Sequence, residues 1–168
     1  MPTTIQLVWA QDRAGAIGRG GEIPWHVPED MAHFREVTGT TVVVMGRKTW
    51  ESLPQRFRPL PNRHNVVVTR SSTFIPDGAE VVSSLEAALD RPDDIVTVMG
   101  GGEIYSAAMD LATHLRITEI DVLVESADAF APEIDQYRWE TDAEQQWQTS
   151  HNGTRYRFVD YRRHGVAR

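Results

Sequence analysis

The stretch GRGGEIPWHVPEDMAHFREVT, residues 18–38, joins a glycine-rich loop to a predicted helix. Three of its first four residues are glycine, which leaves the backbone free to adopt many conformations. Pro28 suits the first turn of a helix, and Asp30 would then lie in that turn, where the helix dipole favours a carboxylate. Asp30 and Phe34 are four residues apart and therefore neighbours on one helix face. This stretch alone is equally compatible with an ordinary helix-start acid and with a functional carboxylate beside an apolar stripe.

Length and composition restrict the class of protein. At 168 residues the chain is long enough to bury a core, and we expect one domain over residues 1–168. It has 17 Lys and Arg against 24 Asp and Glu, a formal net charge of −7, which argues against general binding to nucleic acid or to a membrane surface. Cysteine is absent, which excludes disulfides and thiol catalysis. With no secretory or membrane-spanning pattern, the sequence predicts a cytoplasmic protein.

Charge is distributed unevenly along the chain. Residues 47–70 contain six Lys and Arg and one acid, whereas residues 119–144 contain nine acids and one Arg. We expect the acidic segment to be a solvated loop surface. The basic segment, in an otherwise acidic protein, indicates local binding of a small anionic ligand, although ordinary surface arginines would give the same pattern.

Short apolar runs alternate with helical segments along most of the chain. The apolar runs are rich in β-branched residues, which is typical of buried strands. The predicted strands cover residues 4–10, 40–45, 65–69, 80–82, 95–99 and 115–120. One predicted helix begins at residue 28, and the others cover residues 47–53, 84–90 and 103–110. This alternation favours a mainly parallel sheet with helices on its faces.

The C-terminal part of the chain has a different pattern. Residues 145–149 and 155–161 flank Asn152-Gly153, and Asn-Gly is a strong signal for a hairpin turn. We therefore predict an α/β fold in a single domain. Its central, mostly parallel, twisted sheet would carry helices on both faces and an antiparallel hairpin at its C-terminal edge.

Three of the predicted strands end in residues suited to phosphate binding. In open α/β sheets, ligands bind beyond the carboxyl ends of the strands. Gly46 precedes Arg47-Lys48-Thr49, Thr69-Arg70-Ser71 ends the next strand, and a third strand runs into Gly100-Gly101-Gly102. Glycines let a pyrophosphate approach the backbone closely. No Walker or GxGxxG motif is present, but abundant cations without a ribose-binding acid favour NADP over NAD.

Other catalytic arrangements are not supported by the sequence. It contains no nucleophile elbow and no carboxylate pair in a glycosidase-like context, and His26 and His33 lack the spacing of a metal site. No metal is therefore expected. Asp30 is the one carboxylate in aromatic and aliphatic surroundings. Its two oxygens would suit paired hydrogen bonds from a planar, amidine-like ring edge.

Five segments together resemble dihydrofolate reductase of the bacterial chromosomal type. Their sequences are IPWHVPED with Phe34, VMGRKTWES, LPNR, VMGGGEIY and ITEID, at residues 23–30, 44–52, 60–63, 98–105 and 117–121. Their order and spacing match the family along nearly the whole chain. The resemblance implies that family's fold and the NADPH-dependent reduction of 7,8-dihydrofolate to 5,6,7,8-tetrahydrofolate.

The resemblance also implies a role for many positions. Asp30 would bind the pterin amino group and ring nitrogen, with Thr118 in the same network and Trp25 holding a bridging water. Arg63 would clamp the glutamate carboxylate of the substrate, a bidentate task that suits a guanidinium. Residues 18–25 would form a mobile lid over the nicotinamide. The other implied substrate contacts are Val8, Trp9, Ala10, Met31, Phe34, Leu53, Leu60, Met99 and Tyr105.

The implied cofactor site joins the three strand ends to the lid. Its residues are Ala10, Ile17, Gly18, Gly46, Arg47, Lys48, Thr49, Thr69, Arg70, Gly100, Gly101, Gly102, Glu103, Ile104 and Tyr105. The family has a cis peptide between Gly100 and Gly101, an arrangement that is otherwise rare.

Two positions depart from the family pattern. Glu103 stands where some members have an arginine near the cofactor phosphate, so NADPH preference would depend on Arg47, Lys48 and Arg70. Trp9 is bulky where relatives often have a small residue, so the shape of the pocket and its selectivity for antifolates would differ.

The implied reaction transfers a hydride to pterin carbon 6 while nitrogen 5 gains a proton. Asp30 would not reach nitrogen 5 directly, so a water admitted by the lid is the expected proton donor. Burial should raise the pKa of Asp30 and a bound cationic pterin should lower it; the sequence does not say which effect dominates.

Two alternatives share some of these features. The riboflavin-pathway reductase domain has the same fold and uses NADPH, but it leaves the combination of Pro24-Trp25, Asp30, Phe34 and Arg63 unexplained. A non-catalytic folate or nucleotide carrier would bind its ligand without turnover. The expected partners are dihydrofolate and antifolate inhibitors, without nucleic acid or membrane, and the chain is expected to be a monomer.

Overall fold

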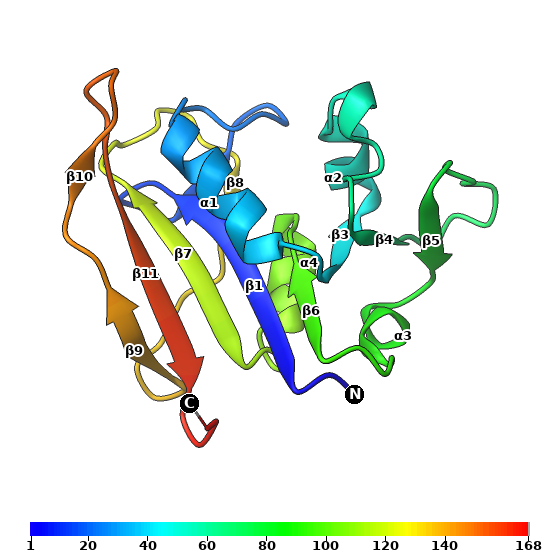
Figure 1. The fold of residues 1–168 in the computed structure, drawn as a ribbon. Coiled ribbons are helices and arrows are strands. Elements are labelled where there is room, and N and C mark those ends of the chain that lie inside the picture. Colours follow the sequence, from blue (N-terminus) through cyan, green and yellow to red (C-terminus); the bar gives the residue numbers. More distant parts are fainter. Residues whose placement is uncertain (168) are drawn as a thin grey trace.

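A nine-stranded mixed sheet forms the centre of the molecule in the computed structural model, which describes residues 1–167 (Figure 1). Its strands run in the order β10-β11-β7-β1-β6-β3-β4-β5, and β9 pairs with β11. Their bounds are β1 Thr4–Gln11, β3 Val42–Gly46, β4 His64–Val68, β5 Ala79–Val82, β6 Ile95–Val98, β7 His114–Ile120, β9 Trp139–Glu144, β10 Gln148–Thr149 and β11 Arg155–Arg163. A separate two-stranded sheet pairs β2 with β8, at Ala16–Gly18 and Ala129–Phe130.

The sheet is parallel in its larger part and antiparallel at one edge. Strands β5, β4, β3, β6, β1 and β7 pair with their neighbours in parallel. Strand β11 runs antiparallel to β7 and also pairs antiparallel with β9 and β10. The predicted α/β fold, with a mostly parallel sheet and an antiparallel C-terminal hairpin, is confirmed.

The helices divide between the two faces according to the direction in which the chain crosses the sheet. The helices are α1 Pro28–Thr38, α2 Arg47–Ser52, α3 Leu85–Leu89 and α4 Gly102–Ala108, with a short 3₁₀ helix, η1, at Gln55–Phe57. Helices α1 and α2 connect strands that step toward β5, whereas α3 and α4 connect steps in the opposite direction. Because such crossovers are right-handed, opposite steps place their helices on opposite faces, as Figure 1 shows for α1 and α4.

Side-chain alternation along the strands gives each face its own core. Leu7 and Trp9 of β1 pack toward α3 and α4, in the larger cluster of buried residues. On the other face, Val43 and Met45 of β3 pack with Trp50 of α2. Successive residues of a strand point to opposite sides, so each strand contributes to both cores.

Helix α1 is held on its face by polar and aromatic contacts. The buried Gln6 amide donates hydrogen bonds to the carbonyl of Val37 and to the hydroxyl of Thr97. The ring of His33 stacks on Phe158 of β11 with centroids 3.9 Å apart, and burial is the main cause of its lowered pKa. These contacts place the first turn of α1 above the carboxyl ends of β1 and β7.

Part of the prediction for residues 119–144 is wrong, because residues 139–144 form β9 beside β11. The buried Trp139 anchors the start of this strand. Its acids are paired across the sheet, since Arg162 forms ion pairs with Glu140 and Asp142. The charges that indicated a loop are therefore balanced by a neighbouring strand, which the local sequence does not reveal.

The hairpin is also shorter on its N-terminal side than predicted. Strand β10 is limited to two residues, whereas the predicted arm covered residues 145–149. The reason is that β11 is shared, because Tyr156 pairs with β10 and residues 159–163 pair with β9. The Asn152-Gly153 turn itself is present, with Gly153 at a φ of +89° and Ser150 N bonded to the Thr154 carbonyl.

Candidate active site

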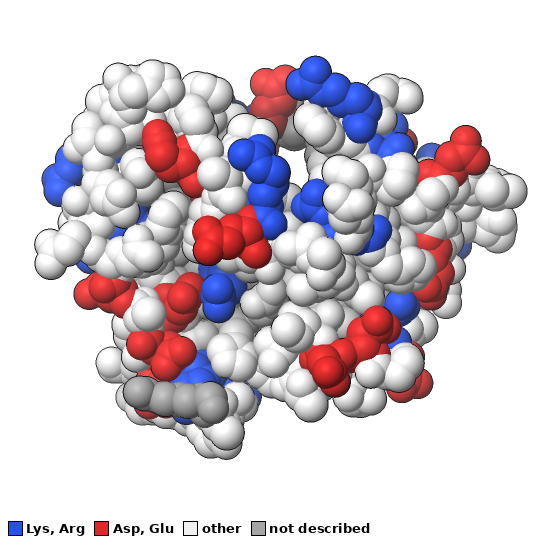
Figure 2. Space-filling view, viewed as in Figure 1, with Lys and Arg blue, Asp and Glu red and all other residues white. Residues whose placement is uncertain are grey.

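The candidate site lies at the carboxyl edge of the sheet, where β1 and β6 are neighbours. The chain leaves β1 toward α1 on one face and leaves β6 toward α4 on the other, so the two connections diverge. In open α/β sheets such a divergence forms the crevice in which ligands bind. In Figure 2 the surface is hollowed between α1 and α2, and Lys and Arg side chains gather there and over α2.

Asp30 reaches this crevice from the first turn of α1. The helix begins at Pro28, has Glu29 and Asp30 as its first-turn acids, and has no side chain capping its N-terminus. Thr118, on β7 opposite Ala10 of β1, donates a hydrogen bond from its hydroxyl to Asp30 Oδ1 at 2.6 Å. The structure thus brings together Asp30 and Thr118, which are 88 residues apart.

Burial dominates the ionisation of Asp30. It raises the pKa of this carboxyl, and the hydrogen bond from Thr118 offsets only part of that effect. The hydroxyl of the buried Tyr105 donates to the Val8 carbonyl at 2.5 Å. Burial and, second to it, the charge of Asp30 raise the pKa of Tyr105. Because little water screens this region, the Asp30 carboxylate interacts strongly with any donor that reaches it.

Trp25 belongs to the lid and packs at the end of β1 and β7. Its half-buried indole packs with Ala10 against a small core of Val27, Ile120 and Tyr156. Asp30, Thr118 and Trp25 therefore come from three separate elements at the same end of β1 and β7.

An apolar wall covers the other side of the crevice. Phe34 of α1, Leu53 after α2, and Met99 after β6 are partly buried against the same cluster, which includes Leu60. These are four of the residues expected to contact substrate. Met31 is 57% exposed and lies at the rim.

Trp9 does not belong to this wall. It alternates with Val8 and Ala10 along β1, so its side chain points to the face covered by α3 and α4. Its ring packs against Tyr105 with centroids 5.0 Å apart, and its indole nitrogen donates to Gln11 Oε1. The Trp9 side chain is only 5% exposed and packs within the core. The predicted contact between Trp9 and substrate therefore has no geometric support.

Arg63 is fixed at the far end of α1. Its guanidinium donates to the hydroxyl of Thr38 and to the carbonyl of Pro61, both at 2.9 Å. Burial first, and the nearby Arg35 second, lower the pKa of Arg63. A guanidinium nevertheless stays charged at neutral pH, so Arg63 presents a pre-oriented cation at the end of the apolar wall.

Two glycine turns meet to form a cradle at the ends of β3 and β6. Gly46 N donates to the Gly100 carbonyl at 2.8 Å, and a Cβ on Gly46 would come within 3.3 Å of Ile104. A Cβ on Gly101 would lie 3.6 Å from Thr49 Oγ1, and one on Gly102 would lie 3.9 Å from Ile17. The peptide between Gly100 and Gly101 is cis, as the resemblance implied. At Gly46 a Cβ would press on Ile104, so glycine lets the two turns approach each other closely.

Exposed cations flank a pocket of about 580 Å³ beyond the cradle. Its wall includes Thr69, Arg70 and Ser71 at the end of β4, and Ser83 after β5. The Arg47 guanidinium lies 4.5 Å from the ring centroid of Phe74, which also lines the pocket. Two further implied cofactor residues are exposed: Lys48 at the start of α2 and Glu103 in the first turn of α4.

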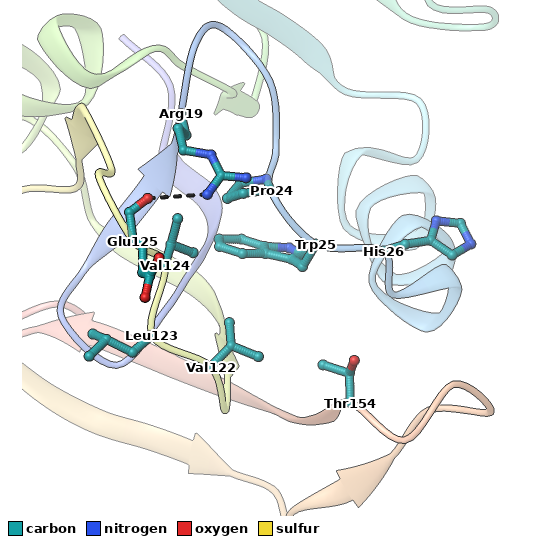
Figure 3. A pocket seen from close by; sticks show the side chains of 9 residues that line it. All are labelled: Arg19, Pro24, Trp25, His26, Val122, Leu123, Val124, Glu125 and Thr154. Carbon is teal, nitrogen blue, oxygen red and sulfur yellow. Dashed lines mark hydrogen bonds between the residues drawn. The ribbon is translucent and has the colours of Figure 1, made fainter.

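The lid, residues 18–25, rests against the segment that follows β7. Gly20 N donates to Asp128 Oδ2 at 2.9 Å, and the Arg19 guanidinium donates to the Glu125 carbonyl at 3.1 Å. Figure 3 shows Arg19, Pro24 and Trp25 on one side of a pocket and Val122–Glu125 on the other. Sequence reasoning missed Asp128 and Glu125, because both lie in the acidic segment and more than 100 residues from their partners.

The hairpin also touches the start of α1. Ser150 Oγ donates to Glu29 Oε1 at 2.7 Å, and the Asn152 amide donates to the His26 carbonyl at 2.8 Å. The first turn of α1, which carries Asp30, is therefore held from β7 and from the hairpin. The Asn152-Gly153 signal predicted the turn, but nothing in the sequence indicated that the turn contacts α1.

The described residues 1–167 contain no group of three or more His, Asp or Glu side chains that could hold a metal ion. No helix within the same range has the length and apolar character needed to cross a membrane.

Fold and site together define a class, an α/β enzyme with a dinucleotide cradle beside a ring-binding pocket. A family model for dihydrofolate reductase matches residues 4–163. Curated dihydrofolate reductases of Mycobacterium tuberculosis and of Neisseria meningitidis serogroup B are each 49% identical to the chain. The first alignment covers 96% of this chain and 99% of the relative, and the second covers 95% and 98%.

Solved structures agree with these relatives. The dihydrofolate reductase from Enterococcus faecalis complexed with NADP(H) and RAB-propyl superposes with a TM-score of 0.87 and 31% identity, over 98% of both chains. The chain belongs to the dihydrofolate reductase family and is an NADPH-dependent oxidoreductase of folate metabolism.

Proposed function

We propose that the chain reduces 7,8-dihydrofolate to 5,6,7,8-tetrahydrofolate by hydride transfer to pterin carbon 6, with a solvent-derived proton added to nitrogen 5, as a step of one-carbon metabolism. The observation that carries this proposal is the partly buried Asp30 carboxylate, whose pKa is raised by burial and which accepts a hydrogen bond from Thr118 beside the apolar wall. A single buried carboxylate can accept two hydrogen bonds from a planar amino-pyrimidine edge. Nothing in the reaction requires a second acid near it.

The residues present fit NADPH. The cradle of Gly46 and Gly100–Gly102 would offer backbone N–H groups to a pyrophosphate, and the Thr49 hydroxyl lies beside Gly101. Arg47 and Arg70 are exposed cations at the adjoining pocket and would pair with a ribose phosphate, with Thr69 and Lys48 nearby. When bound, NADPH supplies the hydride.

Three groups along the crevice would orient the substrate. Asp30, supported by Thr118, would hold the amino group and ring nitrogen of the pterin. Phe34 and the other wall residues would enclose the rings, and Arg63 would pair with the glutamate carboxylate at the open end. Holding the reacting ring in one orientation while excluding water is a large part of the catalytic task.

The proton route follows from the position of Asp30. Its carboxylate faces the amino-pyrimidine edge in this arrangement, so nitrogen 5 lies beyond its reach. We assign the proton to a water admitted beside the lid, with Trp25 holding a second water that joins the Asp30 network. Ala10, Ile17 and Gly18 would line the nicotinamide end under the lid.

The monomeric state, the cytoplasmic location and the lack of nucleic-acid partners stay predictions of the sequence. Antifolate inhibitors are proposed to compete with dihydrofolate at the Asp30 crevice, because their amino-pyrimidine rings present the same donor edge.

The test is an assay of NADPH oxidation with purified protein, with dihydrofolate as substrate and methotrexate as competitor. The proposal predicts stoichiometric formation of tetrahydrofolate, inhibited by methotrexate. A carrier would bind dihydrofolate without oxidising NADPH, and a riboflavin-pathway enzyme would ignore dihydrofolate; either result would contradict the proposal.

A further inference from the structure

Asp12 is a buried acid that the proposed reaction does not use. It follows the last residue of β1 and is 3% exposed. Within residues 1–167, no ion pair that the structure shows involves it. Burying a carboxylate is costly unless its oxygens accept hydrogen bonds. The partners of Asp12 therefore indicate what the buried charge does.

Three backbone N–H groups satisfy this carboxylate. Asp12 Oδ1 accepts from Ala14 N and Ala16 N, both at 2.8 Å. Asp12 Oδ2 accepts from Val124 N, also at 2.8 Å. The first two bonds are local and shape the turn between β1 and β2. The third spans 112 residues and joins that turn to the segment after β7.

Asp12 joins the segment that leads into the lid to the segment that the lid contacts. Ala16 opens β2, which ends at Gly18, where the lid begins. Val124 precedes Glu125, whose carbonyl accepts a hydrogen bond from Arg19 of the lid. Three residues after Glu125, the Asp128 carboxylate accepts a hydrogen bond from Gly20 N, also in the lid. The pocket of about 340 Å³ in Figure 3 lies between this segment and the lid. Asp12 thus sets the distance between the root of the lid and the surface on which the lid rests.

We propose that Asp12 is a positioning residue that holds the lid against residues 124–128. Its part in turnover rests on the proposed role of residues 18–25 in covering the nicotinamide. Asp12 acts through backbone amides and touches no reacting group.

A carboxylate is the side chain that fits this task. Both of its oxygens accept hydrogen bonds, so three N–H groups that converge from two sides are all satisfied. An asparagine has one accepting oxygen, and its amide group would face at least one N–H as donor against donor. Asp12→Asn therefore keeps the size of the side chain but loses the hydrogen bonds on at least one of its two sides.

Arg13→Ala is the matched control. Arg13 joins the same two segments, but its side chain is 59% exposed and pairs with Asp121 at the surface. Exposed pairs of this kind contribute little. The backbone bond from Arg13 N to the Val122 carbonyl remains in this variant.

Limited digestion with trypsin in native buffer measures how often the lid opens, because the cleavable bond Arg19-Gly20 lies within it. Arg138-Trp139, at the start of β9 and outside the lid, serves as the internal reference. We expect Asp12→Asn to raise cleavage after Arg19 about 10-fold relative to cleavage after Arg138. The same ratio in Arg13→Ala should stay close to that of the unmodified chain.

Equal increases at both sites, or no change after Arg19, would overturn the positioning role. Should Asp12→Asn fail to fold, amide exchange in the unmodified chain decides: Ala14, Ala16 and Val124 should exchange together and more slowly than Gly21. Independent exchange of these three amides would also overturn it.

Single-turnover reduction of dihydrofolate separates this inference from the proposed function. A slower single turnover in Asp12→Asn, with cleavage after Arg19 raised, supports both. Raised cleavage with an unchanged single turnover supports Asp12 as the positioning residue and contradicts the proposed catalytic role of the lid.

Discussion

The substrate side and the cofactor side of the site are built in different ways. On the substrate side, one partly buried carboxylate accepts a hydrogen bond from Thr118, and the two residues come from distant parts of the chain. On the cofactor side, glycine turns offer backbone, and the charged groups, Arg47 and Arg70, are exposed. Recognition of substrate thus depends on a charge in a low-dielectric setting, whereas recognition of cofactor depends on backbone shape and solvated cations.

This difference predicts unequal sensitivity to substitution. A hydrogen bond to a buried charge is worth more than one made at the surface, and its loss leaves a buried group unsatisfied. Single changes on the substrate side should therefore cost more than single changes among the exposed cations.

Asp30→Asn should have the largest effect, a loss of about 10²–10³-fold in kcat/KM for dihydrofolate at neutral pH. The amide cannot accept two hydrogen bonds from the pterin edge. The affinity for NADPH, measured by fluorescence titration, should stay within a factor of about three. Glu29→Gln is the control, because Glu29 is the adjacent first-turn acid and its carboxylate accepts a hydrogen bond from Ser150. Equal losses of kcat/KM in the two variants would mean that Asp30 is an ordinary helix-start acid and does not bind the pterin.

Thr118→Val should cost about 10-fold in kcat/KM and change its pH dependence. The Thr118 hydroxyl lowers the pKa of Asp30, so its removal should raise that pKa further. The acidic limb of the profile for kcat/KM, which reports groups in the free enzyme, should move to higher pH. A Thr118→Ser variant keeps the hydroxyl and should keep the original limb; an identical shift in both variants would contradict this account.

Arg70→Ala should raise the KM for NADPH about 10-fold and leave the KM for NADH nearly unchanged. The lost group is a cation for the ribose phosphate, which NADH lacks. Arg91→Ala serves as the control, since Arg91 pairs with Glu80 rather than facing the pocket. A parallel rise in both KM values would mean that Arg70 supports the fold of the pocket and not the phosphate.

Asp30→Asn should also stabilise the protein at neutral pH. The folded pKa of Asp30 lies above its ordinary value of 3.8, so the folded chain holds this proton more tightly than the unfolded chain. Stability is therefore lost as pH rises from about 3.8 through the folded pKa, and the loss stays constant above it. Urea unfolding should give a higher midpoint for the variant at pH 7. Below pH 3.8 this difference should disappear, and a difference that persisted there would have another cause.

Trp9→Phe should have the smallest effect on catalysis, less than about 3-fold in the KM for dihydrofolate. Trp9 packs against Tyr105 on the face away from Phe34, and its loss removes one hydrogen bond to Gln11. The expected cost is about 1 kcal/mol in the free energy of unfolding. A large change in the KM with unchanged stability would place Trp9 in the substrate wall after all.

The sequence was most informative where a signal is local. The glycine turns at Gly46 and Gly100, the proline at the start of α1 and the Asn152-Gly153 turn each dictate backbone shape within a few residues. From these signals and the alternation of strands and helices, the α/β sheet and its antiparallel edge could be predicted. Asp30 could be singled out because it neighbours Phe34 on one helix face and because the family resemblance gives this position a role.

Contacts between distant segments could not be predicted in this way. The bond from Gly20 to Asp128 spans 108 residues, and neither residue type specifies the other. The face taken by Trp9 was hidden because Val8 and Ala10 on either side are also apolar, so alternation gave no pattern. Strand β9 was missed because its acids find arginine partners on β11 that only the fold brings close.

A crystal structure of the chain with NADP⁺ and folate tests the central claim most directly. We expect both Asp30 carboxylate oxygens to lie within hydrogen-bonding distance, about 2.7–3.2 Å, of the pterin amino group and adjacent ring nitrogen. We also expect Arg47 or Arg70 on the ribose phosphate and Trp9 without contact to either ligand. A pterin edge bound by other groups, with Asp30 facing only Thr118, would contradict the claim.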